Sequence, residues 1–566
     1  MRTGTAHILA ISGLHMGVVA LFFYYLTLFF LKRSEYLALK YNIIKLSYMT
    51  TLIFIILYSL LVGMRVSSVR AAIMIGVYIL SVLFEKSQNT LRTMVIAAFI
   101  ILLFYPASLF DISFILSFSA VFSILYFYPK LNLKIDQYFE RDSGSYFKKK
   151  WSLLSIVKYS LISLLISCVI NLVVLPVVLY NFNYVSLTAP INNAIIIPIY
   201  SILIIPLNFV IFLLSLVSEA AAELVLHLNE YLIHLTIIML RFLDRYLNYA
   251  IYTVTPSVVE IALYLGFIFS LFKMRQRWFK LAALSLLIAL IATSYYNRTS
   301  RQSSDELIVR AIDVGQGESF LIEFPNGEKM IIDGGGSYRS GTFDIGRDVI
   351  AKYLWREKIG KIDYIVSTHP HPDHIGGLFF LCQNFSPDKI FISDLDYKYM
   401  AYGSFVKRFK DKIEYVTDKN RSVSIGGAKI EFMNYDYDGP LKSNIEINRS
   451  SLIVKLTYAD KKILFTSDID STVEGSLIDK NIDIKSDILK VAHHGSKHSS
   501  SSRFLSAVSP EYAILSVGYD NFFHLPAKDS IERLNEQGVK IFRTDYNGMI
   551  TIKLSNKKID FTTYIK

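Results

Sequence analysis

The distribution of apolar residues divides the chain into two regions. Residues 1–296 consist mainly of long apolar runs, whereas residues 306–566 alternate short apolar runs with polar turns. A helix that crosses a bilayer needs about 20 apolar residues, so the first region predicts a multi-pass α-helical membrane domain. The second region predicts a soluble α/β domain of two sheets covered by helices. Residues 297–305 form a polar linker between them.

The membrane region contains about ten candidate spans. They are residues 6–31, 44–64, 66–84, 93–105, 107–128, 153–180, 185–215, 218–245, 257–272 and 279–296. Segment 93–105 is short, and segment 218–245 carries enough charged residues to lie flat on a membrane as an amphipathic helix. Basic residues such as Lys148, Lys149 and Lys150 concentrate in alternate loops, which predicts that these loops are cytoplasmic. Ten spans then leave the C-terminal domain outside the cytoplasm, attached to the cell membrane.

Polar side chains and prolines interrupt several of these apolar segments. Polar groups at membrane depth are costly and usually face protein or water. Helix packing accounts for any one of them, but together they favour a polar path across the membrane. The candidate channel residues are Ser12, His15, Arg65, Arg70, Asn171, Asn192 and Asn193. The two arginines either anchor a helix to lipid headgroups or attract a phosphate at the outer face.

Composition agrees with a membrane protein that carries a soluble domain. Of the 566 residues, 53% are hydrophobic and 19% are charged, and the mean hydropathy is +0.40. These values exclude an ordinary cytosolic enzyme and a disordered protein. The net charge of +12 fits either basic cytoplasmic loops or attraction of a polyanion. The two cysteines, Cys168 and Cys382, do not form a disulfide framework.

The soluble region concentrates metal-binding side chains directly after short apolar strands. One strand is followed by His369, His371, Asp373 and His374. Imidazole suits zinc, iron or manganese and carboxylate adds charge, so this loop can contribute ligands to two metal ions. Asp468 ends another strand and can bridge the two ions.

Further polar residues end other predicted strands. His493 and His494 precede Gly495, which leaves room for a phosphate to approach the backbone. Asp313 and Asp333 each lie beside glycines at a strand end. Their expected role is to orient the ligand loops, because the residues around a metal site fix the direction of its ligands.

The metal loop, followed by Asp468 and a late His524, resembles the metallo-β-lactamase fold, which is an αββα sandwich. By itself, His524 would be unremarkable. The resemblance implies two metal sites that share one carboxylate. One would contain His369, His371 and Asp468, and the other Asp373, His374, Asp468 and His524.

A more specific resemblance covers nearly the whole chain. Asp-Val-Gly-Gln-Gly at 313–317 and His-His-Gly-Ser at 493–496 are similar to the C-terminal domain of the ComEC family, the DNA-uptake proteins of natural competence. The stretch from Gly to His at 4–15, the Ser-Phe-x-Leu-Ser-Phe motif at 113–118 and Asn-x5-Pro at 192–198 resemble the competence domain of that family. The two halves match in the family's order.

The chain departs from the ComEC pattern at its start, and it departs from many metallo-β-lactamases at one motif where it follows the ComEC pattern. ComEC proteins usually begin with extra spans and an OB-like region, which the sequence lacks before its competence-type domain. The third histidine motif of many metallo-β-lactamases is also absent, and its place is taken by Asn-Arg-Ser-Ser at 448–451. One of the two expected metal ions would therefore be weakly held.

The resemblance implies a channel that passes single-stranded DNA inward while a metal-dependent nuclease degrades the other strand. The cofactors would be two divalent ions, zinc or manganese. Asp373, Asp468 and His494 would be catalytic. His493, His494 and Ser496 would contact the phosphate, and the two histidines could exchange roles. The DNA would be recognised through its backbone charge rather than its bases.

Two other functions remain open at this point. The chain could be a membrane-anchored metallo-hydrolase of another phosphodiester, such as a choline phosphoester. It could also be a channel whose soluble domain binds DNA without cleaving it. The sequence contains no Gly-x4-Gly-Lys-Ser/Thr motif, so the expected partners include a separate cytoplasmic ATPase motor in addition to a DNA receptor.

Overall fold

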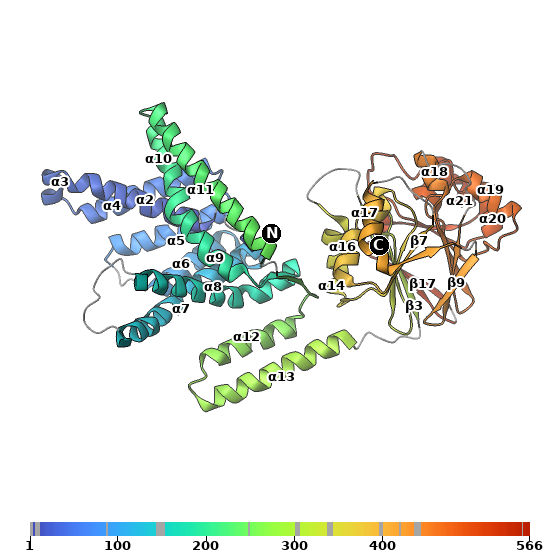
Figure 1. Ribbon diagram of the computed structural model, residues 1–566, viewed down its shortest axis with the longest axis horizontal. Helices are drawn as coiled ribbons and strands as arrows, with labels where there is room; N and C mark the ends of the chain where they lie inside the picture. Colours follow the sequence, from blue (N-terminus) through green and yellow to red (C-terminus); the bar gives the residue numbers. More distant parts are fainter. Residues whose placement is uncertain are drawn as a thin grey trace. The chain divides into compact units, whose positions relative to one another are not determined.

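The computed structural model describes the chain in eleven segments, which divide between two compact units. The segments are residues 4–5, 12–85, 89–142, 153–246, 249–299, 306–336, 343–394, 400–417, 420–434, 443–556 and 558–565. The first unit is Met1–Ile288 and the second is Ala289–Lys566. The first is built almost entirely of helices, and the second contains the large β-sheets (Figure 1).

The first unit contains long helices joined by short turns. Its elements are α2 (Gly13–Lys32), α3 (Glu35–Lys40), α4 (Ile43–Leu61), α5 (Val66–Leu83), α6 (Thr90–Phe104), η1 (Pro106–Phe110), α7 (Ile112–Asp142), α8 (Leu153–Phe182), β1 (Tyr184–Ser186), α9 (Ala189–Ile199), η2 (Tyr200–Ile204), α10 (Ile205–Ser215), α11 (Glu219–Tyr246), β2 (Ala250–Tyr252), α12 (Val258–Phe272) and α13 (Arg277–Thr299). The boundary between the two units falls within α13.

Eight helical stretches in the described residues are long and apolar enough to cross a membrane, as expected for a multi-pass membrane protein. Helices α6 and α12 are the two shorter apolar helices among the ten predicted spans. Each has 15 residues, which is about 22 Å at the α-helical rise and less than a typical hydrocarbon core. The sequence pattern therefore located the helices, but ten full-length spans are not supported.

The segment predicted as a single irregular span at 185–215 has two parts. Strand β1 pairs antiparallel with β2, so residues 184–186 belong to a small sheet and not to a span. From residue 189 the chain stays helical, with the π-helical turn η2 between α9 and α10. Pro198 and Pro206 lack an N–H group, and the helix adjusts its hydrogen bonding near them without unwinding.

The second unit is an αββα sandwich. Its strands are β3 (Leu307–Ala311), β4 (Phe320–Glu323), β5 (Lys329–Ile332), β6 (Tyr364–Ser367), β7 (Lys389–Ser393), β8 (Ile413–Val416), β9 (Asn420–Ile425), β10 (Ala428–Met433), β11 (Ile453–Tyr458), β12 (Lys461–Phe465), β13 (Ile488–Lys490), β14 (Tyr512–Leu515), β15 (Lys540–Arg543), β16 (Ile550–Leu554) and β17 (Ile559–Thr563). One sheet has the order β17-β16-β3-β4-β5-β6-β7-β8, and the other has the order β15-β14-β13-β12-β11-β10-β9.

Helices connect these strands and cover the sandwich. They are η3 (Gly346–Ile350), α14 (Ala351–Arg356), α15 (Pro372–Ile375), α16 (Leu378–Phe385), α17 (Met400–Phe409), η4 (Lys410–Lys412), α18 (Asn444–Arg449), α19 (Ser471–Asp479), η5 (Ala492–Gly495), α20 (Ser502–Val508), α21 (Lys528–Glu536) and α22 (Thr544–Asn547). Helices α14, α16 and α17 lie on one side of the sandwich, and α19, α20 and α21 lie on the other (Figure 1).

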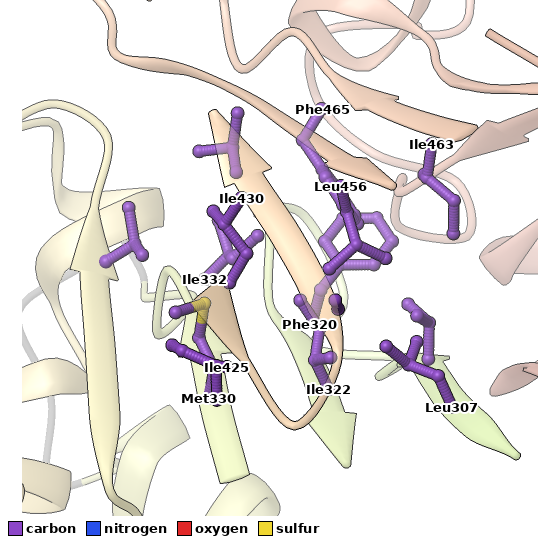
Figure 2. Packing of buried hydrophobic residues seen from close by; sticks show 14 of the residues in the cluster. Leu307, Phe320, Ile322, Met330, Ile332, Ile425, Ile430, Leu456, Ile463 and Phe465 are labelled. Atoms are coloured by element: carbon purple, nitrogen blue, oxygen red, sulfur yellow. The ribbon is translucent and has the colours of Figure 1, made fainter. Parts of the chain in front are cut away.

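The main core lies between the two sheets. Leu307, Val309 and Ala311 on β3 are fully buried and alternate with half-buried residues, as a strand with one face on a core requires. Figure 2 shows side chains from both sheets meeting in this layer. They include Phe320, Ile322, Met330 and Ile332 from the first sheet, and Ile430, Leu456, Ile463 and Phe465 from the second.

A second core joins the other face of the seven-stranded sheet to its helices. Val473 and Leu477 of α19 and Phe504 of α20 are buried in the same cluster as Leu464 and Leu489 from the strands. Both sheet faces are thus buried near β12 and β13, which gives the loops that follow these strands a rigid base.

Candidate metal centre

The polar residues of the site follow strands that run in the same direction. β5 and β6 are parallel neighbours, and so are β12 and β13. Asp333 follows β5, the loop 369–374 follows β6, Asp468 follows β12, and His493 and His494 follow β13. The carboxyl ends of parallel strands meet at one edge of a sheet, where ligands commonly bind.

Four buried side chains, two from the loops of each sheet, converge at the site. Asp373, His374, Asp468 and His494 each offer a ligand atom, and these atoms lie within 4.8 Å of one another. Asp468 Oδ2 is 3.4 Å from His374 Nε2 and 3.7 Å from His494 Nε2. Asp373 Oδ2 is 3.5 Å from His494 Nε2. Two carboxylates and two imidazoles form a ligand set suited to a divalent transition metal.

The two imidazoles are oriented as metal ligands. His374 Nδ1 is 2.7 Å from Asp333 Oδ2, and His494 Nδ1 is 2.7 Å from the Ser516 carbonyl oxygen. A proton on each Nδ1 would be donated to these oxygens, which leaves each Nε2 free to bind a cation. Both Nε2 atoms are buried and have no hydrogen-bond partner in the described parts of the chain. The residues at the site therefore fit a metal ion.

Asp333 makes further contacts that hold the loop after β6. Its carboxylate accepts hydrogen bonds from the Thr368 N–H at 2.9 Å and the Thr368 hydroxyl at 2.6 Å. Asp333 thus contacts both a ligand histidine and the backbone of the ligand loop, as the predicted orienting role needs. Asp313 does not reach the site: it is exposed, and its carboxylate accepts from the Gly315 N–H in its own turn.

His369 and His371 lie beside the four-residue group. His369 Nε2 is 3.1 Å from His371 Nδ1 and 3.9 Å from Asp468 Oδ2. His369 Nδ1 contacts the hydroxyl groups of Thr368 and Ser467, at 3.1 and 3.2 Å. His369 thus lies within 4 Å of both His371 and Asp468, the other residues predicted for the first metal site, but the three do not form one of the candidate ligand groups of the described residues.

The late histidines take different places from those expected. His494 joins the four-residue group. The side chain of His524 is exposed and lies outside this group and outside the other candidate ligand group of the described residues, which is Glu318, Asp333 and His374. The second predicted ligand set thus assembles with His494 in the place expected for His524.

The backbone explains why adjacent histidines point in different directions. His493 and His494 both have positive φ, +50° and +54°, a conformation that non-glycine residues rarely adopt. Such strain is concentrated at functional sites. It leaves His494 buried and His493 partly exposed, with His493 Nε2 3.8 Å from Asp468 Oδ2. His493 also lies 3.4 Å from the Asn448 amide, measured from Nε2 to Nδ2.

Ser496 follows these histidines and is buried, and its Oγ accepts from the His498 N–H at 3.4 Å. Gly495 does not leave the room that the sequence suggested. A Cβ on this glycine would lie 2.6 Å from Pro526 Cβ, so the glycine allows the loop 518–527 to pack against the histidine turn.

Two other glycines allow the ligand loops to pack backbone to backbone. A Cβ on Gly336 would lie 1.8 Å from the Pro372 carbonyl oxygen. A Cβ on Gly377 would lie 2.1 Å from the Gly334 carbonyl oxygen. These contacts join the loop after β5 to the loop after β6, and any side chain there would separate them.

The charges at the site shift the pKa values of its buried side chains. Burial opposes charge on Asp468, but the surrounding imidazoles, His374 first, hold its pKa well below the ordinary value. Burial also favours neutral His374 and His494, but the Asp468 carboxylate raises the pKa of both rings. Burial lowers the pKa of His369 well below its ordinary value. A cation would therefore compete with protons at His374 and His494.

Two buried charged residues behind Asp468 were not among the predicted site residues. Lys490 and Glu318 are both fully buried and form an ion pair. Lys490 Nζ also donates to the Ser467 carbonyl oxygen at 2.8 Å. The sequence offered one indication of this ion pair. Lys490 ends an apolar strand, and a lysine that is fully buried there needs a partner. The identity of that partner was not readable from the sequence.

The predicted channel residues have varied surroundings within the first unit. Arg70 is buried, and its guanidinium contacts Asp111 at 3.1 Å and Ser113. Arg65 is exposed, at the start of the same helix. Asn171 donates within its helix to the Ser167 carbonyl oxygen at 2.8 Å.

The remaining predicted channel residues lie near helix beginnings. Ser12 contacts His15 Nδ1 at 3.3 Å at the start of α2. Asn192 and Asn193 are both buried in the first turns of α9. Residues 6–11 of the N-terminal motif lie outside the described residues.

Comparisons with known proteins match both units. Residues 1–278 match a family model described as Competence protein, and residues 312–519 match one described as Metallo-beta-lactamase superfamily. The chain is 27% identical over 588 residues to ComE operon protein 3 of Bacillus subtilis (strain 168), covering 100% of this chain and 70% of that protein. It is 24% identical over 555 residues to Competence protein ComA of Neisseria gonorrhoeae, covering 97% of this chain and 71% of that protein.

Among solved structures, the chain is similar to the metallo-beta-lactamase fold protein YhfI from Bacillus subtilis. The sequence identity is 13% and the TM-score is 0.29, with 46% of this chain and 100% of that chain covered.

Proposed function

Because the chain belongs to the ComEC family of competence proteins and carries a C-terminal metallo-β-lactamase domain, we propose that it takes up DNA across the cell membrane. The helical unit would form the channel for one strand. The sandwich would lie outside the cytoplasm and hydrolyse phosphodiester bonds of the other strand. A DNA receptor and a separate cytoplasmic ATPase motor would be its partners.

The observation that supports hydrolysis is the buried group of Asp373, His374, Asp468 and His494. These residues would hold one divalent ion, zinc or manganese. His369 and His371, together with Asp468, would hold a second ion more weakly, because that set has three protein ligands. A bound divalent ion supplies Lewis-acid activation of the phosphodiester and of water.

The protein groups would have distinct roles around the phosphate. Asp333 and the Ser516 carbonyl would keep His374 and His494 in the tautomer that presents Nε2. Asp373, which would be a ligand of that ion, would also accept a hydrogen bond from the attacking water. His493 is the most accessible ring beside Asp468, so it would contact the phosphate, and Ser496 would assist it. In this scheme His493, rather than His494, contacts the phosphate.

Hydrolysis is tested with the purified full-length chain in detergent. Single-stranded DNA is incubated with the protein and Mn²⁺ or Zn²⁺, with and without a chelator, and the products are separated by length. Wild-type protein should cleave only with metal, and Asp468→Ala should not cleave. Asp479→Ala is the matched control, because Asp479 is an exposed carboxylate paired with Arg503 on the surface.

Three results would contradict the proposal in different ways. Metal-dependent binding of DNA without cleavage would indicate a catalytically inactive DNA-binding domain. Hydrolysis of a choline phosphoester without DNA cleavage would indicate another phosphodiesterase. Cleavage that survives Asp468→Ala would mean that the metal centre is not the site of hydrolysis.

The proposed orientation is tested by labelling intact cells. Lys528 is 88% exposed on α21, so Lys528→Cys offers an accessible thiol in a chain whose Cys168 and Cys382 are replaced by alanine. An impermeant thiol reagent should label this variant in intact cells. Labelling that requires lysis would place the sandwich in the cytoplasm.

A further inference from the structure

The seven-stranded sheet contains two buried lysines with different surroundings. Lys455 on β11 is paired with Asp483, whose side chain is 69% exposed, through contacts of 2.8 Å to the carboxylate and 2.7 Å to the carbonyl oxygen. Lys490 on β13 is paired with Glu318, which is fully buried. Lys455 thus reaches towards solvent, whereas Lys490 remains entirely inside the protein, beside the metal centre.

The two oxygens of Asp468 face different partners. Oδ2 is directed at the imidazoles, with Nε2 of His374, His494 and His493 at 3.4, 3.7 and 3.8 Å. Oδ1 is 3.8 Å from Lys490 Nζ and has no hydrogen-bond partner in the described residues. The ammonium therefore attracts one oxygen of the carboxylate and leaves the other for the ligand histidines.

Lys490 is itself held in place. Its ammonium donates to the Ser467 carbonyl oxygen, in the residue just before Asp468, and pairs with Glu318. Glu318 is attached to the metal loop, because its N–H donates to the Asp373 carbonyl oxygen at 3.1 Å. The pair connects the loop that carries Asp373 to the loop that carries Asp468.

We propose that Lys490 is a positioning residue of the metal centre. Its ammonium, held by Glu318 and the Ser467 carbonyl, fixes the rotation of the Asp468 carboxylate so that Oδ2 is the oxygen offered to the cation. Without the ammonium, the carboxylate could rotate and the ligand set would lose its arrangement. This inference rests on the proposed metal centre, but it does not depend on the reaction that the centre performs.

A charge-neutral double variant isolates this role. Removing Lys490 alone would also remove a positive charge that repels the cation, and the two effects would oppose each other. Lys490→Met with Glu318→Gln removes both charges of the pair. The matched control is Lys455→Met with Asp483→Asn, which removes another lysine–carboxylate pair from the same sheet.

The measurement is binding of Co²⁺ to the full-length protein in detergent, followed by its visible absorption spectrum. The Lys490/Glu318 variant should bind Co²⁺ about 10–100-fold more weakly, the usual effect of losing a partner behind a metal ligand. Its spectrum should change because the ligand geometry changes. The Lys455/Asp483 control should bind within about twofold of wild type, with the same spectrum, since it leaves every contact of Asp468 intact.

Unchanged Co²⁺ affinity and spectrum in the Lys490/Glu318 variant would overturn the proposal. If that variant does not fold, Lys490→Met alone replaces it: loss of a repelling charge would strengthen binding without changing the spectrum, so a changed spectrum would still report loss of the Asp468 orientation. Absence of Co²⁺ binding by wild-type protein would instead refute the metal centre. Binding without DNA cleavage would refute only the nuclease.

Discussion

Buried polar side chains have different partners in the helical unit and in the sandwich. In the helical unit, many of them bond to the helix that carries them: the hydroxyls of Ser47, Thr51 and Thr236 each donate to the carbonyl oxygen four residues earlier, at 2.7–2.8 Å. In the sandwich, buried polar residues from separate loops meet in one group, as Asp333 and His374 do.

This difference decides how strongly a polar residue indicates function. A hydroxyl that bonds within its own helix needs no other partner in an apolar environment. Convergence of four ionisable side chains from the loops of two sheets has no comparable local explanation, since burying charges is costly unless they have partners. The contact between Arg70 and Asp111 is a counterpart in the helical unit, because it connects separate helical segments.

The largest expected effect is on the convergent group. Asp468→Asn keeps the shape of the side chain but removes the charge that faces four histidines, so metal content should fall sharply. DNA cleavage should fall by more than about 100-fold. That factor is the upper range for losing a residue that only supports a metal ligand, whereas Asp468 is proposed as a ligand itself. Metal analysis and cleavage assays on the purified chain measure both effects. Normal metal content in Asp468→Asn would mean that this carboxylate is not a ligand.

A second pair of variants tests whether His494 or His524 is a metal ligand. His494→Ala should weaken metal binding by about 10-fold or more, because a buried imidazole is lost from the four-residue group. His524→Ala should change it by less than about threefold, because His524 is exposed and outside that group. Titration of the two variants with Co²⁺ compares them directly. The reverse order would restore the ligand set expected from the sequence.

The pH dependence of metal binding tests the electrostatics of the group. Asp468 raises the pKa of His374 and His494 despite their burial, so these rings keep their protons to higher pH than a free histidine. Protons compete with the cation, and affinity should therefore fall as the pH decreases through the raised pKa values. Each displaced proton lowers the apparent affinity by about tenfold per pH unit below its pKa. Equal affinity for Zn²⁺ at pH 8 and pH 6 would contradict this expectation.

The smallest effects are expected in the helical unit, where the roles of Arg65 and Arg70 can be tested separately. Arg70→Gln should destabilise the protein by about 1–3 kcal/mol, because it removes a charged hydrogen bond to Asp111. Arg65→Gln should leave thermal unfolding unchanged, because Arg65 is exposed. If Arg65 attracts DNA phosphates, that variant should still reduce uptake by cells modestly. Normal uptake would leave Arg65 with no role in the path, and lipid anchoring would then suffice.

The sequence by itself determined the features that depend on neighbouring residues. Long apolar runs identified the helical segments, since a membrane-crossing helix satisfies its own backbone. The loop from His369 to His374 was recognisable because its polar residues are close together and follow an apolar strand. Asp333 was recognisable as a strand-end carboxylate beside glycines. Two resemblances, one in each half, then indicated the ComEC family before the fold was known.

Only the tertiary structure decided which distant residues meet. The left-handed backbone at His493 and His494 brings His494 into the ligand group, whereas His524, nine residues after the end of β14, lies outside that group. The partnership of Lys490 and Glu318 also depends on how the two sheets pack, since Lys490 ends β13 of one sheet and Glu318 lies in the loop before β4 of the other. Side-chain spacing along the chain describes one loop at a time, whereas these contacts depend on how the loops of two packed sheets face each other.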